Sequence, residues 1–393
     1  MQLEFLDMED NEPMFVCLEC LGDPMLRMSK VALMSERICA ACGQPTRKAL
    51  TPKRIAHFIG KYLPTHFMVD YGLHPGYEMT LADVVNIAIR CDNALIGEAI
   101  AQHLIEADAD EEGFYWPGQE YCWAPSPFES EEHERWWVVG EWNSIAEELS
   151  HGRRFFNDKA RKFFDSLIFE ALNAESAECP GTLAVIKTLP SGTNFYRART
   201  AKNQIEVQVF KDNPAKELGA PPKEHAGNNR MSAAGVSLLY VSQDTATCIA
   251  EVQPSAGATV VVGEFSSTSP LTIFDFTALS NQLKLTPLSL FSPGYQRRGD
   301  HQRLLHYLHD EIAQPVRVRD THYVMTQALA EFIRYHEQQP FDGISFRSVQ
   351  HDGGVNFVLF DKSNSETMYS HGGRSRFDLE ISNTAVTTHH FTE

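Results

Sequence analysis

Two pairs of cysteines near the start of the chain constrain its folding more than any other feature. Cys17 and Cys20 form one CxxC pair, Cys39 and Cys42 form a second, and eighteen residues lie between the pairs. This spacing is typical of a four-cysteine zinc site, in which each turn presents two thiolates to one ion. A closed shell of four sulfurs leaves no open position for catalysis, so we expect a structural zinc. Chance cysteines and a redox dithiol are the alternatives.

Length and charge narrow the class of protein. At 393 residues the chain is too long for one typical core, so we expect two or more domains. Its 34 basic and 52 acidic residues give a formal charge of −18, which argues against direct nucleic-acid binding because non-specific affinity for phosphate backbones needs basic residues. No secretory leader pattern and no apolar run long enough for a membrane span is present, so we expect a cytoplasmic protein without membrane contact.

The N-terminal half has a helical pattern after the cysteine pairs. Thr80 and Asp83 form a capping-box signature ahead of one long amphipathic helix that extends to about residue 107. A further helical pattern covers 144–173, with Phe155 and Phe156 in its apolar stripe. We expect two other aromatic residues, Trp136 and Trp137, to pack in a core.

The C-terminal half has a mixed pattern. Cys179, Pro180 and Gly181 interrupt the helical periodicity, so a domain boundary is expected near residue 178. Runs rich in β-branched and aromatic residues then alternate with short helical segments, one of which begins after Asp244 as N-cap. The sequence therefore predicts an α+β protein: a helical domain with a zinc knuckle, followed by a mixed domain whose small split sheet encloses a cleft.

One segment of the mixed half carries three residues with a shared chemical use. Arg230, Tyr240 and Glu251 lie on a strand-then-helix pattern, ten and then eleven residues apart. An arginine fits phosphate oxygens, a tyrosine stacks on a flat heterocycle and a glutamate stabilises developing positive charge. Together they suit a pocket for a dinucleotide. The alternative is an ordinary ion pair of Arg230 and Glu251, with Tyr240 as a core residue.

The order of motifs between Phe195 and Phe360 resembles the RES-domain family. The motifs are FYRAR, LGAPP, NRMSAAG with LLYVS, ATCIAEV, and DGISFRS with GGVNFVLF. The resemblance implies a compact relative of ADP-ribosyltransferases that degrades NAD, usually as the toxin of a bacterial toxin and antitoxin pair. It divides the chain into a zinc knuckle (1–50), a helical domain (51–177), a RES domain (178–362) and a flexible tail (363–393).

The resemblance also implies roles for individual residues. The resemblance assigns catalytic roles to Arg230, Tyr240 and Glu251. It assigns substrate binding to Ser348, Asn356 and Arg197. Arg199 competes with Arg197, because both lie on one face of the same predicted strand. The sequence departs from the family pattern at Arg347, where many members have proline, and in MSAAG after Arg230.

The helical half resembles the HEPN class that precedes some RES domains. Active HEPN members cleave RNA with an arginine and a histidine that are separated by four to six residues. The helical half has no such spacing, and Arg317 to His322, which fits it, lies inside the RES-like region. We therefore expect a role in regulation, dimerisation or target sensing for this half, with a plain structural domain as the alternative.

The expected activity is cleavage of the nicotinamide–ribose bond of NAD by hydrolysis or phosphorolysis, with zinc as a structural ion and NAD as substrate. The alternatives are a mono-ADP-ribosyltransferase that modifies a macromolecule and a catalytically silent nucleotide-binding sensor. An NAD-degrading enzyme would poison its producer, so an antitoxin protein is an expected partner. A homo-oligomer is a further possibility.

Overall fold

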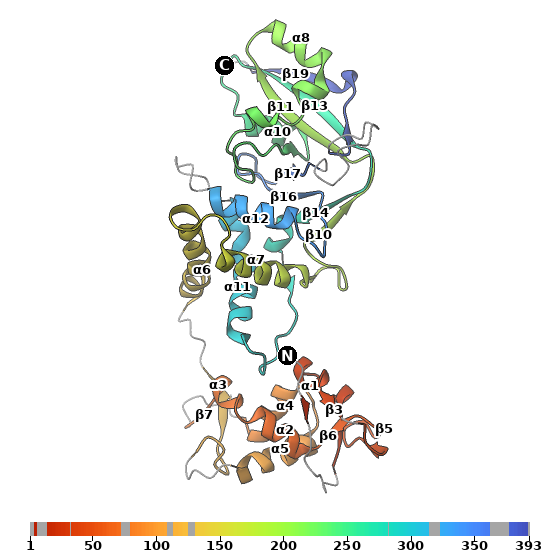
Figure 1. Ribbon diagram of the computed structural model, residues 1–393, viewed down its shortest axis with the longest axis vertical. Coiled ribbons are helices and arrows are strands. Elements are labelled where there is room, and N and C mark those ends of the chain that lie inside the picture. Colours follow the sequence, from red (N-terminus) through yellow and green to blue (C-terminus); the bar gives the residue numbers. More distant parts are fainter. Residues whose placement is uncertain are drawn as a thin grey trace. The chain divides into compact units, whose positions relative to one another are not determined.

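The computed structural model describes most of the chain, in two compact units (Figure 1). Unit 1 comprises 1–130 together with 287–299, and unit 2 comprises 131–286 together with 300–393. Within the described residues, no helix is both long and apolar enough to cross a membrane. The described residues are 4–5, 14–31, 33–71, 79–107, 113–124, 130–281, 283–313, 323–361 and 377–391.

Unit 1 begins with short strands and turns and continues with helices that pack around one core. Among its residues, Leu26, Ile59, Val85 and Ile100 are fully buried. Its pairs are β1 with β3, β2 with β6, β4 with β5, and β7 with β8. The elements are β1 (Glu4–Phe5), β2 (Val16–Cys17), α1 (Pro24–Arg27), β3 (Lys30–Val31), β4 (Arg37–Ile38), β5 (Pro45–Thr46), β6 (Ala49–Leu50), α2 (Pro52–Ile59), α3 (Leu63–His66), β7 (Phe67–Val69), α4 (Leu81–Ile89), α5 (Ala94–Ala107) and β8 (Tyr121–Trp123).

The capping box predicted at Thr80 and Asp83 is confirmed at the start of α4. The Thr80 side chain accepts a hydrogen bond from the Asp83 N–H, and the Asp83 side chain accepts one from the Thr80 N–H. The single long helix expected to follow it is wrong, because α4 ends at Ile89 and its C-cap residue, Arg90, has the left-handed conformation (φ 54°). A separate helix, α5, begins at Ala94. Amphipathic periodicity continues across the break, so it gave no sign of the interruption.

A segment far along the chain completes the core of unit 1. Phe291 is fully buried and its ring packs edge-on against Phe58 at a centroid distance of 5.5 Å. The Leu290 carbonyl is hydrogen-bonded to His66 Nε2 at 2.8 Å, and the Ser289 hydroxyl donates to Asp23 at 3.0 Å. Unit 1 is therefore built from two stretches of sequence, a division that differs from the predicted boundaries at 50 and 177.

Unit 2 is built on a nine-stranded sheet in the order β10-β14-β16-β17-β12-β11-β13-β18, with β19 also paired to β13. Only β14 and β16 are parallel; the other neighbours are antiparallel. A small pair, β9 (Glu175–Ser176) and β15 (Leu283–Lys284), lies outside it. The strands are β10 (Ile186–Leu189), β11 (Asn194–Ala201), β12 (Leu239–Ser242), β13 (Thr259–Ser267), β14 (Leu271–Asp275), β16 (Gly343–Arg347), β17 (Val355–Leu359), β18 (Leu379–Glu380) and β19 (Val386–His390).

Alternating side chains of the sheet pack into different cores. Phe274, Ile344 and Val358 join the core formed with α6, α7, α11 and α12, whereas Ile273 and Leu359 join the core that contains residues of α8. The short helix α10 packs on β11 in a small third cluster. The helices are α6 (Glu131–His151), α7 (Asp158–Leu172), α8 (Gln204–Asp212), α9 (Pro214–Glu217), α10 (Thr245–Val252), α11 (Tyr295–Ala313) and α12 (Val324–Arg334).

The helical pattern predicted over 144–173 is two helices, and its first aromatic residues are exposed. α6 ends at His151 and α7 begins at Asp158. Phe155 and Phe156 lie in the connection and are 75% and 91% exposed, so their predicted place in the apolar stripe is wrong. The expected packing of Trp136 and Trp137 is also wrong, since these side chains are 70% and 50% exposed.

The predicted flexible tail contains strands of the main sheet. Residues 362–376 lie outside the described part of the chain, but β18 and β19 both pair with β13. The Phe391 N–H then donates to the Ala258 carbonyl at 3.0 Å. Described residues of this segment therefore belong to the sheet of unit 2.

Candidate active site

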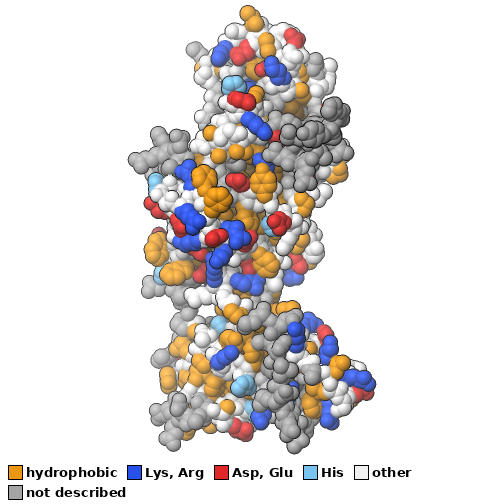
Figure 2. All heavy atoms as spheres, viewed as in Figure 1, with side chains coloured by type: hydrophobic (Ala, Val, Ile, Leu, Met, Phe, Trp, Pro, Cys, Tyr) orange, Lys and Arg blue, Asp and Glu red, His pale blue; other side chains and the backbone are white. Residues whose placement is uncertain are grey.

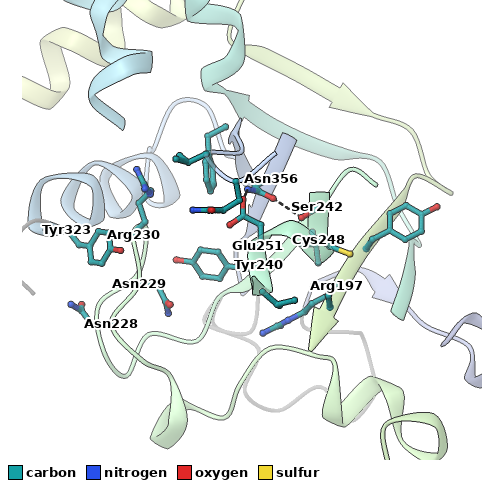
Figure 3. Close-up of a pocket in the computed structure, with 17 residues that line it drawn as sticks. Arg197, Asn228, Asn229, Arg230, Tyr240, Ser242, Cys248, Glu251, Tyr323 and Asn356 are labelled. Carbon is teal, nitrogen blue, oxygen red and sulfur yellow. Dashed lines mark hydrogen bonds between the residues drawn. The ribbon is translucent and has the colours of Figure 1, made fainter. Parts of the chain in front are cut away.

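Unit 2 contains a cavity of about 380 Å³ where two neighbouring strands diverge (Figure 3). β11 pairs with β13 along eight residues but with β12 only at Tyr196 and Ser242. The volume of the cavity is within the range of small-molecule sites. The cavity is lined by Tyr196, Arg197, Ala198, Asn228, Asn229, Arg230, Tyr240, Val241, Ser242, Cys248, Glu251, Val252, Tyr323, Phe346, Val349, Gln350 and Asn356.

Arg230 lies in a loop that α12 holds in place. The Arg230 carbonyl accepts a hydrogen bond from Thr326, and Gln327 Nε2 donates to the Asn229 carbonyl at 2.7 Å. The Arg230 guanidinium donates to the carbonyl of Ile312 at the end of α11. Burial lowers the pKa of Arg230. The loop thus presents a half-buried cation to the cavity from a fixed backbone.

Tyr240 enters the cavity from β12 and is tied to the same loop. Its hydroxyl accepts a hydrogen bond from the Met231 N–H at 3.2 Å and is bonded to the Ser232 hydroxyl at 3.1 Å. Burial raises the pKa of Tyr240, so the phenol stays neutral at physiological pH. Because the hydroxyl is held by the loop, the ring is the part of Tyr240 that is left for contact with a ligand (Figure 3).

Glu251 is the penultimate residue of α10 and its side chain is exposed at the cavity. The N-cap predicted for this helix is confirmed: the Asp244 carboxylate accepts hydrogen bonds from the Thr247 N–H at 2.7 Å and the Thr247 hydroxyl at 2.8 Å. Burial opposes ionisation of Asp244, but these hydrogen bonds outweigh it and lower the pKa of the carboxyl. α10 is therefore anchored at the end opposite Glu251.

Two predicted substrate-binding residues are hydrogen-bonded to Glu251. Ser348 Oγ and Asn356 Nδ2 both donate to Glu251 Oε1, each at 2.6 Å. Ser242, on the neighbouring strand, donates to Asn356 Oδ1 at 2.7 Å and so fixes the orientation of the amide. Among the described residues, none is bonded to Glu251 Oε2. One carboxylate oxygen is thus held, and the other remains available at the cavity.

The loop that carries Ser348 is locked against the start of α10. Ser348 Oγ accepts from the N–H groups of Gln350 and His351, at 3.1 and 3.0 Å. His351 Nδ1 is in turn hydrogen-bonded to the buried Thr247 hydroxyl at 2.9 Å. A Cβ on Gly354 would lie 2.5 Å from that hydroxyl, so the loop can approach α10 only with glycine at this position.

Of the two arginines on β11, Arg197 is the one that lines the cavity. It donates to the Gly219 carbonyl at 2.8 Å and, in the described part of the chain, has no acidic partner. Burial, together with the positive charge of Arg199, lowers the pKa of Arg197 to about 9. A half-buried arginine with no carboxylate beside it is suited to an anionic ligand.

Several cavity residues were not singled out from the sequence. Asn228 and Asn229 lie beside Arg230, Tyr323 precedes α12, and Ser242 supports Asn356 (Figure 3). Ser242 could have been found, because it is two residues after Tyr240 on the same strand face. The others lie in loops or at a helix end, where no periodicity marks them.

One comparison with known families covers the residues of this cavity. Residues 194–378 match the family model of the RES domain. The match contains all six predicted active-site and substrate-binding residues, Arg197 to Asn356. It supports the RES-domain family, whereas the HEPN-like character of 51–177 stays a prediction. No curated protein and no solved structure matches the chain.

The four cysteines predicted as ligands come together in unit 1. All four sulfur atoms lie within 4.8 Å of one another. The Cys17–Cys42 and Cys20–Cys39 sulfurs are 3.9 Å apart, close to the edge of about 3.8 Å in a tetrahedron of sulfurs with 2.3 Å bonds to zinc. Burial opposes ionisation of Cys39, but backbone N–H groups outweigh it and lower the pKa of its thiol to about 7. The cluster could hold a metal ion.

Proposed function

We propose that unit 2 cleaves the bond between nicotinamide and ribose in NAD. The observation that carries this proposal is the state of Glu251, whose Oε1 is held by Ser348 and Asn356 while Oε2 remains available at the cavity. Departure of nicotinamide leaves positive charge on the ribose, as in glycoside cleavage. A carboxylate fixed before the reaction stabilises that charge without a cost of reorganisation.

In this proposal Ser348 and Asn356 act through Glu251. Both donate to a single oxygen, which sets the angle of the carboxylate. The available oxygen is then directed at the ribose, either at the 2′-hydroxyl or at the incoming nucleophile. In this role the two residues position Glu251, whereas the sequence predicted that they contact the substrate directly. A ribose hydroxyl that reaches Ser348 would allow this residue to do both.

The two cavity arginines are proposed to hold the pyrophosphate of NAD. Arg197 has no acidic partner among the described residues, and Arg230 is oriented by its bond to Ile312 at the far side of the cavity. Paired N–H donors fit phosphate oxygens, and the grip would place the ribose over Glu251. Tyr240, with its hydroxyl held, would stack its ring on the nicotinamide.

The acceptor of the ADP-ribosyl group is proposed to be water or phosphate. The side chains that activate NAD are the same for either acceptor, so the reaction products identify it. Such an activity would deplete NAD in the cell, which fits a toxin whose producer is protected by an antitoxin protein. A transferase that modifies a macromolecule would use the same donor site.

Zinc is the proposed ion of the cysteine cluster. Four thiolates in a tetrahedral arrangement suit zinc, and the closed ligand set gives a structural role in unit 1. No step of the proposed reaction involves this ion.

The proposal is tested by incubating purified full-length protein with NAD, with and without phosphate, and separating the products by mass spectrometry. Free nicotinamide with ADP-ribose indicates hydrolysis, and ADP-ribose 1″-phosphate indicates phosphorolysis. Intact NAD in the presence of folded, monodisperse protein would contradict the proposed activity. Glu251→Gln is the matched control because it retains the shape of the side chain and removes its charge.

A further inference from the structure

Helix α6 has two opposite faces, and the part of the chain that the structure describes covers only one of them. Val138, Trp142, Ile145 and Leu149 are buried against the rest of unit 2. The other face carries, at the same helical spacing, the exposed residues Glu132, Trp136, Gly140, Asn143 and Glu147. Trp136 is 70% exposed on this face, which is unusual for so large an apolar side chain, and its ring contact is with His133 in the preceding turn, at a centroid distance of 6.2 Å.

The ends of this face have opposite charge. Glu131 and Glu132 begin the helix, and Arg153 and Arg154 follow its last turn. Within the part of the chain that the structure describes, Glu131, Glu132 and Arg153 have no ion-pair partner. Exposed aromatic side chains accompany both ends, Trp136 at the acidic end and Phe155 at the basic end. Over the region of α6 and α7, hydrophobic and basic side chains lie side by side (Figure 2).

The backbone of this face is also suited to close approach. Gly140 is exposed in the middle of α6, and a Cβ added there would meet nothing within 4 Å. Glycine destabilises a helix interior relative to alanine. No neighbouring atom of unit 2 would clash with a side chain at Gly140, so packing within unit 2 does not explain the glycine. Phe156 adopts a positive φ of 52°, a conformation that a large side chain rarely adopts, and is 91% exposed.

We propose that the exposed face of α6 joins two copies of this chain as an antiparallel helix pair. If the pair is centred on Asn143, Glu132 at the start of α6 in each copy lies near the arginines that follow α6 in the other, and Gly140 lies between Asn143 and Glu147 of the other. Both halves of the charge pattern are present in one copy, at the start of α6 and just after its end, so a two-fold axis satisfies both at once. A second copy is favoured over an unrelated partner, because the acidic and the basic end are separated by the length of α6 in every copy. In two antiparallel copies both ends can therefore meet an opposite charge at once.

Charge reversal with mixing tests this pairing most sharply. Glu131→Lys/Glu132→Lys and Arg153→Glu/Arg154→Glu each place like charges opposite each other in a pair of identical copies. Each variant alone should self-associate about tenfold or more weakly than the unmodified protein. An equimolar mixture should form a mixed dimer, because each reversed end then meets an opposite charge in the other variant.

Sedimentation velocity from low to high micromolar concentration gives the readout, with Lys202→Glu on the exposed surface of β11–α8 as control. Gly140→Leu should also weaken association, since its side chain separates the helices. Recovery of the dimer in the mixture shows that both variants are folded. A monomeric unmodified protein at all concentrations, a dimer indifferent to Gly140→Leu, or no recovery in the mixture would each overturn the proposal.

Discussion

Asn356 donates from Nδ2 to Glu251 Oε1 at 2.6 Å, and its own amide oxygen accepts from Ser242 at 2.7 Å. This chain of bonds joins two neighbouring strands to the end of a helix. It fixes Glu251, the one acidic side chain among the described residues that line the cavity together with Arg197 and Arg230. The proposed chemistry depends on this relationship, because a carboxylate that rotates freely would not be directed at the ribose.

Asn356→Asp should shift the pH dependence of NAD cleavage. A second carboxylate beside Glu251 raises the pKa of the pair, so activity should be lost at a higher pH than in the unmodified protein as the pH falls. The reaction rate measured across the acid limb tests this. Asn356→Ala should lower the rate at every pH by about 10- to 100-fold with a much smaller shift. If the acid limbs of the pH–rate profiles of Asn356→Asp and of the unmodified protein coincide, Asn356 does not act through the carboxylate of Glu251.

Arg197→Ala should raise the NAD concentration needed for half-maximal rate by about 10- to 100-fold, since a hydrogen bond to a charged group contributes about 1.5–3 kcal/mol. Arg199→Ala is the matched control from the same strand and should have a much smaller effect, because Arg199 does not line the cavity. The curves of rate against NAD concentration for the two variants show which arginine binds NAD. Equal effects would contradict the assignment of Arg197.

Asp244→Ala should destabilise unit 2 by about 1 kcal/mol and also slow NAD cleavage, because it removes the N-cap that anchors α10. Asp244→Asn retains a capping acceptor and should retain most of the stability of unit 2 and most of the rate of NAD cleavage. Since the pKa of Asp244 is lowered by folding, its ionic contribution to stability is complete above its unfolded pKa of about 3.9 and is lost as the pH falls through the lower folded value. Denaturant unfolding of both variants at two pH values measures this.

Cys20→Ser should release the bound metal and lower the unfolding temperature of unit 1 by more than about 5 °C, because ion binding stabilises the folded cluster. Cys179→Ser, an exposed cysteine outside the cluster, is the control and should change neither. Metal analysis and calorimetry of the full chain provide the measurements. Purified protein with less than about half an equivalent of zinc would contradict the zinc assignment.

Features set by neighbouring residues were the ones the sequence predicted well. The caps at Thr80 and Asp244 are bonds between a side chain and backbone three residues away, so a short motif contains the whole interaction. The CxxC pairs work in the same way, because each turn brings its own two sulfurs together. Such signals need no knowledge of the tertiary fold.

Several features that depend on distant contacts could not be predicted from local patterns. Phe291 completes the core of unit 1 although it lies far along the chain, and β19 pairs with β13 although its sequence resembles a tail. Phe155 fits a helical stripe, yet the helix ends before it. Periodicity describes how a segment would bury its apolar side chains, but not whether another part of the chain covers them.

The most direct measurement is NAD turnover by the unmodified protein beside Glu251→Gln, with nicotinamide release followed by mass spectrometry and folding checked by circular dichroism. The account predicts that Glu251→Gln folds normally and loses at least about 100-fold in rate, because the charge that stabilises the ribosyl cation is gone. Equal turnover by the two proteins would contradict the role of Glu251 and, with it, the proposed mechanism.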